Sequence, residues 1–240
     1  MDQQSLPESV DNRYYLEKSI FIEEIDGLEL WRLGNDHFDE FNDFIFRVYG
    51  EAFGENGNLP FTHSDIAEQS KIYFHRTKVC GIKHPSGVLL GTWGLVLKDL
   101  RKDSYPLPIE TRYGLSSEEI VKSTGATDIS YIFNGWRTAI DKEAIQKLNI
   151  PKQKSIFIFD FLLRGLTKDF AGNSSSYLGV SEMEMLVLKY HRRVGIPWVI
   201  LGEPLHFWGR DRFPCAFQLG LFEDYLKTNH PERHKFIYAK

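Results

Sequence analysis

Two apolar runs separated by a short turn signal place the strongest constraint on the fold. The runs KIYFHRTKVCGIKH (71–84) and GVLLGTWGLVLK (87–98) flank the segment HPSG (84–87). Proline and glycine between two apolar runs are typical of a β-hairpin. Predicted strands and helices alternate further along the chain. We therefore expect an α/β (α+β) fold with a mixed sheet and helices on both of its faces.

The other elements follow from hydrophobic periodicity and capping signals. Strands are predicted at 28–33, 128–141, 174–180, 196–202 and 213–222, and helices at 38–53, 62–69, 115–123, 149–173 and 181–195. The last helix is expected to begin at Ser181, with Glu184 completing a capping box. We expect one domain over residues 28–225, an arm over 1–27 and a polar tail over 226–240.

Composition narrows the functional classes. Of the 240 residues, 42% are hydrophobic, which is enough for one substantial core. The net charge of -4 argues against a broad nucleic-acid surface, and the 14% aromatic content is enough to line an apolar tunnel as well as a core. The longest uncharged run, 86–97, is too short to span a membrane, and the N-terminus lacks the features of a signal peptide. We expect a soluble, cytoplasmic protein without a membrane span.

Cysteine and histidine give no strong catalytic or metal signal. Cys215 follows a proline in an apolar strand without a nearby histidine, which favours a core cysteine over a nucleophile. His230 and His234 are four residues apart, but no third ligand is close, so no metal site is predicted. Neither a phosphate loop nor a dinucleotide-binding glycine motif occurs.

The strand DISYIFNGWRTAID (128–141) carries unusual residues at its centre. Its apolar pattern is interrupted by Asn134, Gly135, Trp136 and Arg137. An arginine stays protonated, so inside a sheet it needs a carboxylate, phosphate or carbonyl partner, whereas on an exposed face it needs none. Both readings of Arg137 are open from the strand alone. Gly135 would let a ligand approach closely or accommodate a bulge, and alternation would place Trp136 and Arg137 on opposite faces.

The segment PKQKS (151–155) opens the helix predicted after this strand. A helix N-terminus offers free amide groups and a partial positive charge, to which Lys152 and Lys154 would add. This arrangement is suited to a pyrophosphate or a phosphopantetheine phosphate. A solvated basic turn explains the same residues.

The element order, with three stretches, resembles the GNAT N-acyltransferases. LPIETRYG (107–114), NGWRTAID (134–141) and SEMEMLVLKYHRRVGIPWVILGEP (181–204) are similar to motifs of one branch, the acyl-homoserine lactone synthases and long-chain N-acyl amino acid synthases. The resemblance covers residues 28 to 225. The usual GNAT pyrophosphate loop is missing, and DKEAIQKLNIPKQKS (141–155) stands in its place. The lactone synthases carry a glutamate where this chain has Asn134.

The resemblance implies a mostly antiparallel central sheet with one splayed parallel pair, the strands 128–141 and 174–180. The pantetheine arm of an acyl thioester would lie in the gap. Implied donor-binding residues are Gly135, Trp136, Thr138, Ala139, Ile140, Lys152 and Lys154. Arg137 would position an acceptor carboxylate or pair with Glu110. The remaining implied catalytic residues are Asn134 as a hydrogen-bond donor, Glu110 or Glu182 as the base, and Tyr190 as the acid for the leaving thiolate.

The implied function is transfer of an acyl group, expected to be long, from acyl-CoA or an acyl carrier protein to the amine of an amino acid or similar small molecule. The amine attacks directly, so neither a covalent intermediate nor a tightly bound cofactor is expected. Two alternatives remain open: an ordinary acetyl-CoA-dependent N-acetyltransferase, and a catalytically silent acyl-thioester-binding module. A basic cluster of Lys152, Lys154, Arg192 and Arg193 would favour the acidic carrier protein as the partner.

Overall fold

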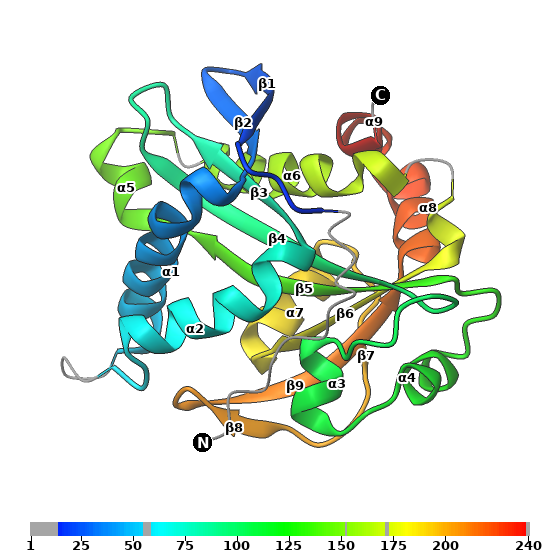
Figure 1. The fold of residues 1–240 in the computed structure, drawn as a ribbon. Helices are drawn as coiled ribbons and strands as arrows, with labels where there is room; N and C mark the ends of the chain where they lie inside the picture. Colours follow the sequence, from blue (N-terminus) through cyan, green and yellow to red (C-terminus); the bar gives the residue numbers. More distant parts are fainter. Residues whose placement is uncertain (1–13, 55–58, 152, 171–172, 239–240) are drawn as a thin grey trace.

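A computed structural model describes residues 14–54, 59–151, 153–170 and 173–238. Within these ranges the strands form one nine-stranded sheet (Figure 1). The order is β1 (Ile20–Ile25), β2 (Leu28–Arg32), β3 (Thr77–Lys83), β4 (Leu89–Asp99), β5 (Tyr131–Ile140), β6 (Tyr177–Met183), β9 (Arg210–Gln218) and β7 (Val199–Ile200), with β8 (Leu205–Phe207) paired to β9. All described pairs are antiparallel except β5 with β6. The predicted mixed, mostly antiparallel sheet is confirmed.

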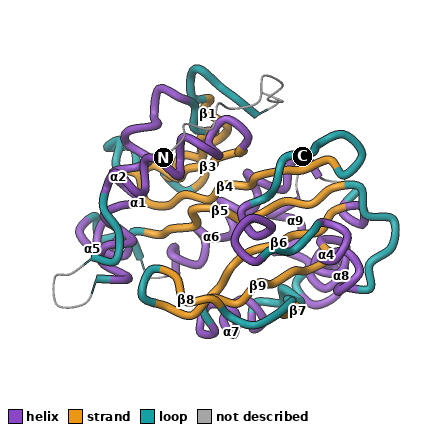
Figure 2. Tube along the Cα trace, turned by 60° about the horizontal axis from the view of Figure 1, so that its bottom comes forward, coloured by secondary structure: helices purple, strands orange, loops and turns teal. Residues whose placement is uncertain are grey.

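Helices cover both faces of the sheet, as predicted. One apolar core lies under α1 (Phe38–Phe53), α2 (His63–Tyr73), α3 (Pro108–Tyr113) and α4 (Ser117–Thr124). The other lies under α5 (Lys142–Lys147), α6 (Gln153–Thr167), α7 (Met185–Arg193), α8 (Leu219–Asn229) and α9 (Pro231–Tyr238). Figure 2 shows the strands as one layer that runs from β1 at one side to β8 and β9 at the other. Among the described helices, none is both long and apolar enough to cross a membrane.

The predicted hairpin forms between β3 and β4. Its turn is closed by hydrogen bonds between His84 and Val88 and from the Gly87 amide to the His84 carbonyl. Residues 71–76 of the predicted strand 71–84 are instead the end of α2 and a 3-10 turn, Phe74–Arg76. Thr62 and Asp65 form a capping box that starts α2 and favours the helix through residue 73.

The parallel strands β5 and β6 separate after four residue pairs. Pairing runs from Tyr131 with Tyr177 to Asn134 with Val180, and Gly135 and Ser181 are the first residues beyond it. The prediction that a helix begins at Ser181 is wrong. Residues 181–183 stay in β6, because they pair with 213–215 of β9, and α7 starts at Met185 after an N-cap without a side-chain hydrogen bond. The sheet partner outweighs the local capping pattern.

A β-bulge lies in β5, two residues later than Gly135. Arg137 and Thr138 stand opposite Trp93 alone on β4, and Arg137 takes a left-handed backbone conformation with φ of 51°. Such a conformation costs a non-glycine residue about 1–3 kcal/mol and is frequent at functional sites. The bulge brings Trp136 and Arg137 to the same side, where the guanidinium lies 5.5 Å from the Trp136 ring. The predicted placement of these two residues on opposite faces is therefore wrong.

The end of the chain is folded rather than a polar tail. The predicted strand 213–222 ends at Gln218, where α8 begins, and α9 follows directly. Leu226 and Ile237 are fully buried in the core beside α6. At the other end, β1 lies within the predicted arm and pairs with β2. Regular elements therefore extend beyond both predicted limits, and the domain limits themselves stay a prediction.

Candidate active site

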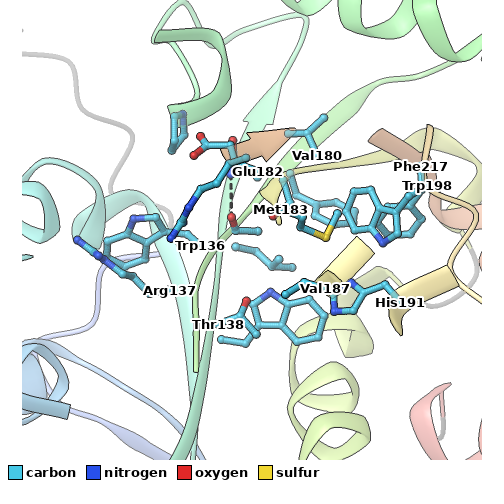
Figure 3. Close-up of a pocket in the computed structure, with 18 of the residues that line it drawn as sticks. Trp136, Arg137, Thr138, Val180, Glu182, Met183, Val187, His191, Trp198 and Phe217 are labelled. Carbon is cyan, nitrogen blue, oxygen red and sulfur yellow. Dashed lines mark hydrogen bonds between the residues drawn. The ribbon is translucent and has the colours of Figure 1, made fainter. Parts of the chain in front are cut away.

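A cavity of about 240 Å³ lies where β5 and β6 separate. Its walls include side chains from both apolar cores, so the cavity connects the two faces of the sheet. Figure 3 shows Arg137 and Trp136 at one end, Trp198, Phe217 and Met183 at the other, and Glu182 between them. The two ends differ in chemistry.

One end is an apolar chamber on the α6 side. We use this name for twelve side chains that line the cavity and belong to that core: Trp93, Leu95, Phe133, Leu163, Leu166, Phe170, Met183, Ile196, Trp198, Phe217, Leu219 and Phe222. They are contributed by β4, β5, β6, β9, α6, α8 and the segments after α6 and α7. None carries a charge, so this end suits an alkyl chain.

The opposite end is rich in arginine and aromatic rings. We call it the arginine end: Arg112, Arg137 and Arg212 line it together with Tyr49, Phe53, Gln69, Tyr73, Trp136, Phe207 and Trp208. The guanidinium carbons of Arg137 and Arg212 lie 5.2 and 5.7 Å from the centroid of the Trp208 ring. Aromatic walls hold guanidinium groups by cation–π attraction without neutralising them.

Arg137 is buried without a counter-ion within the described ranges. Its side chain donates weakly to the Ile66 carbonyl (3.4 Å) and to Gln69 Oε1 (3.3 Å), and its Nε is buried without a partner. Burial is the main cause that lowers the Arg137 pKa to about 10, and the charges of Arg112 and Arg212 lower it further. The group therefore remains protonated at neutral pH, and it is suited to bind an anion.

The other two arginines differ from each other. Arg112 forms an ion pair with Glu182 of β6, and that carboxylate keeps its Oε1 buried without a partner. Arg212 has Nε and Nη2 buried without hydrogen-bond partners among the described residues, and its guanidinium lies 4.9 Å from the Phe53 ring. The arginine end therefore carries more positive than negative charge in the part of the chain that the structure describes.

Comparison with known proteins identifies the fold. No protein-family model and no curated protein sequence matches the chain. Among solved structures, it is similar to FeeM, an N-acyl amino acid synthase from uncultured soil microbes, with 12% identity, a TM-score of 0.53 and coverage of 86% of this chain and 93% of that one. The sheet order and the splayed parallel pair agree with this similarity. The chain has the GNAT fold.

Two further solved structures are similar to the chain at lower scores. The acyl-homoserine lactone synthase LasI has 14% identity and a TM-score of 0.49 over 80% of this chain and 89% of that one. An acetyltransferase of the GNAT family from Staphylococcus aureus Mu50 has 9% identity and a TM-score of 0.47 over 80% and 99%. At these identities the likeness concerns the fold.

The GNAT splay brings several predicted residues into the cavity. Gly135, Trp136, Arg137 and Thr138 all line it. Asn134 also lines it, but its amide is engaged within the protein: Oδ1 accepts from the Ile109 amide and Nδ2 donates to the Gly135 carbonyl. These bonds fix α3 against β5. Ala139 and Ile140 lie past the bulge, pair with β4 and do not line the cavity.

Glu110 is not placed at the cavity, and the predicted pairing with Arg137 is wrong. Both its oxygens accept from Lys98 Nζ at 2.9 and 2.8 Å, and it also accepts from the Leu107 amide and the Ser117 hydroxyl. Because both of its oxygens accept hydrogen bonds, the carboxylate caps α3 and forms a buried ion pair with Lys98. Glu182 is the predicted carboxylate that does line the cavity.

Tyr190 is also outside the cavity. It is 45% exposed on α7, whereas the next residue, His191, lines the cavity. The two side chains point in different directions, because one residue turns a helix by 100°. Burial lowers the His191 pKa to about 4, and its Nδ1 has no partner among the described residues.

The remaining predicted residues are settled only in part. Lys152 and the side chain of Lys154 lie outside the described residues, so their predicted phosphate contact stays a prediction. Arg192 donates to the Trp198 carbonyl at 2.8 Å. Cys215 is fully buried with a pKa raised by burial to about 12, which confirms the core cysteine.

Sequence reasoning missed three important lining residues. Arg112 lies within the quoted stretch 107–114, and Arg212 immediately precedes the predicted strand 213–222. Trp93 lies in the predicted hairpin, where its apolar surroundings indicated only a core residue. The signal was available for the arginines, since each interrupts or adjoins an apolar segment.

Proposed function

We propose that this protein is an N-acyltransferase that moves an acyl group from a thioester to the amine of a small molecule bearing a carboxylate, such as an amino acid. The observation that carries the proposal is the two-ended cavity at the β5–β6 splay. An apolar chamber and an arginine end meet at this point, as an acyl donor and an anionic acceptor would require. FeeM, which shares the fold, is described as an N-acyl amino acid synthase, and this supports the same reaction class.

The donor side is supported by shape and polarity. Beyond Asn134 and Val180 the two parallel strands no longer pair, and an extended pantetheine arm would add its amides to their edges. The acyl chain would then enter the apolar chamber. A chamber walled by twelve apolar side chains favours a long chain over an acetyl group. The donor is acyl-CoA or an acyl carrier protein thioester.

The acceptor side is supported by the unbalanced charge. A carboxylate placed between Arg137 and Arg212 would supply the counter-ion that neither guanidinium has in the described residues. Because the surrounding walls are aromatic, water screens this attraction poorly. An amine without a carboxylate would leave both charges uncompensated, so the arginine end selects against it.

The chemistry needs one proton transfer and no bound cofactor. The acceptor nitrogen forms a bond to the thioester carbon, the C–S bond breaks, and the leaving thiolate takes up the proton that the amine loses. The amine loses a proton to a base. Glu182 is the candidate base, acting directly or through water, because it lines the cavity and one of its oxygens has no partner among the described residues.

The test is free-thiol release from long-chain and acetyl thioesters, each on CoA and on acyl carrier protein, with and without a pool of amino acids. The proposal predicts release that requires an amino acid and favours long chains. Activity only with acetyl-CoA would indicate an ordinary N-acetyltransferase instead. Tight binding of thioesters without thiol release would indicate the catalytically silent binding module. Product mass spectrometry would identify the acceptor.

The matched pair of variants is Arg137→Met and Arg101→Met. Arg101 is exposed, pairs with Asp99 and does not line the cavity, so its loss removes one positive charge without touching the site. Release should collapse only in Arg137→Met. Equal activity in both variants would contradict the acceptor assignment.

A further inference from the structure

Two side-chain donors converge on Gly135 at the start of the splay. A Cβ placed on Gly135 would lie 3.5 Å from Trp93 Nε1 and 3.5 Å from Ser181 Oγ. The Trp93 indole N–H is buried without a hydrogen-bond partner among the described residues. No partner for the Ser181 hydroxyl occurs in those residues either. At Gly135 the wall of the cavity thus has a small polar point.

The location of this point is defined by the fold. Gly135 and Ser181 are the first residues of β5 and β6 beyond their last pair. Trp93 belongs to the apolar chamber and stands on β4 opposite the bulge that carries Arg137 of the arginine end. The acyl chain and the acceptor would approach from these two sides, so the thioester carbonyl would lie at the junction.

The indole is held rigidly. The Trp93 ring packs on Phe159 of α6 with ring centroids 5.1 Å apart, and the side chain is only 8% exposed. A buried donor without a partner costs free energy, whereas phenylalanine would fill much of the same space without that cost. Gly135 leaves the space in front of the N–H free, because any side chain there would contact both donors.

We propose that the Trp93 indole N–H, assisted by the Ser181 hydroxyl, binds the carbonyl oxygen of the acyl thioester and stabilises the oxyanion that forms on it. This inference rests on the proposed acyl transfer. When the amine nitrogen bonds to the carbonyl carbon, the π electrons move to the oxygen, where both donors meet the developing charge. They return when the C–S bond breaks and the thiolate leaves, taking a proton.

The experiment combines turnover with a carbonyl-specific readout. Dodecanoyl thioesters labelled with ¹³C at the carbonyl, on CoA and on acyl carrier protein, are bound to wild type, Trp93→Phe and Ser181→Ala. Isotope-edited infrared spectra report the hydrogen bond as a shift of the carbonyl band to lower frequency. We expect this shift in wild type, its loss in Trp93→Phe, and a kcat about 10²-fold lower, as is typical when one oxyanion donor is removed.

Trp198→Phe is the matched control. Trp198 also lines the chamber with a buried, unpartnered Nε1, but it packs on Phe217, with ring centroids 4.4 Å apart. We expect its carbonyl band to stay at the wild-type position. Thermal unfolding should show Trp93→Phe to be as stable as wild type, which separates the loss of the donor from a folding defect.

The outcomes separate this inference from the proposed function. A shift of the carbonyl band in wild type that is lost in Trp93→Phe supports the carbonyl subsite. If no amine is acylated in the same experiment, the proposed function fails and the subsite stands. Normal turnover and an unchanged band in Trp93→Phe would overturn the subsite and leave the function standing. Absence of a shift in wild type with both donors would also overturn it.

Discussion

Two buried charged residues on the same side of the sheet, Glu110 and Arg137, differ in whether the protein supplies an oppositely charged partner. Glu110 is surrounded by donors, and its ion pair with Lys98 is closed by atoms of this chain. Arg137 has aromatic rings and two long hydrogen bonds, but no carboxylate in the described residues. Removing one partner of a satisfied buried pair destabilises the fold, whereas an unsatisfied charge that lines a cavity is suited to bind a ligand. Stability and activity should therefore respond to different substitutions.

The largest effect on stability is expected at the satisfied charge. Glu110→Ala leaves the Lys98 ammonium buried and unpaired and removes the cap of α3, so the free energy of unfolding should fall by about 3–5 kcal/mol. Urea unfolding measures this value. The double variant Lys98→Met/Glu110→Leu should recover most of it. If Glu110→Ala lost no more free energy of unfolding than the double variant, the pairing of Glu110 with Lys98 would not explain the stability of this region.

Substitution of Arg137 should lower activity rather than stability. Arg137→Met removes the proposed carboxylate contact, and kcat/KM for the acceptor should fall by about 10²–10³-fold, equivalent to roughly 3–4 kcal/mol. The free energy of unfolding should stay the same or rise, because a buried cation without a counter-ion is lost. Arg137→Lys should recover little, since it keeps the charge without the planar fork.

A marked destabilisation with unchanged kcat/KM would contradict this prediction. Arg137 would then be a structural residue, like Glu110, and the acceptor would have to bind elsewhere. The measurement pairs acceptor-dependent kinetics with urea unfolding on the same preparations, so both halves of the comparison are read from one set of samples.

The sequence predicted the frame of the fold better than the placement of its charges. The hairpin and the α1 helix follow from local periodicity, which short-range forces enforce. The start of α7 was wrong because the competing signal, antiparallel pairing of 181–183 with β9, comes from distant residues. Tyr190 was predicted at the site, but on the observed α7 it is exposed and His191 lines the cavity.

The site was predictable only where it rests on the parallel pair. Gly135 and Arg137 were found because they interrupt an apolar strand. The sequence alone could not separate Glu110 from Glu182 as the candidate base. The two differ in their partners, since the hairpin brings Lys98 to Glu110 and α3 brings Arg112 to Glu182. The bulge that turns Arg137 toward Trp136 has no signature in β5 itself.

The apolar chamber offers a further way to sharpen the comparison, since it contributes to the same cavity as Arg137. Leu166 of α6 is fully buried and lines the chamber. Leu166→Phe should shorten the chamber and lower kcat/KM for long-chain donors by roughly tenfold or more relative to short ones, within the 1–3 kcal/mol range of such pocket changes. Leu162→Phe is the matched control, because Leu162 is equally buried on α6 but does not line the cavity. An identical chain-length profile in both variants would show that the chain does not enter there.

His191 provides a third kind of buried group, one that avoids an unpaired charge by losing its proton. Burial lowers its pKa from 6.5 to about 4. The unfolded chain therefore binds a proton between these values while the folded protein does not, so stability is complete above about pH 6.5 and declines as the pH falls toward 4. At about pH 5 the loss due to His191 should be roughly 2 kcal/mol. Urea unfolding at a series of pH values should show this decline in wild type and a shallower one in His191→Phe. Parallel curves would mean that His191 keeps its proton in the folded protein, and the chamber would then tolerate an uncompensated charge as the arginine end does.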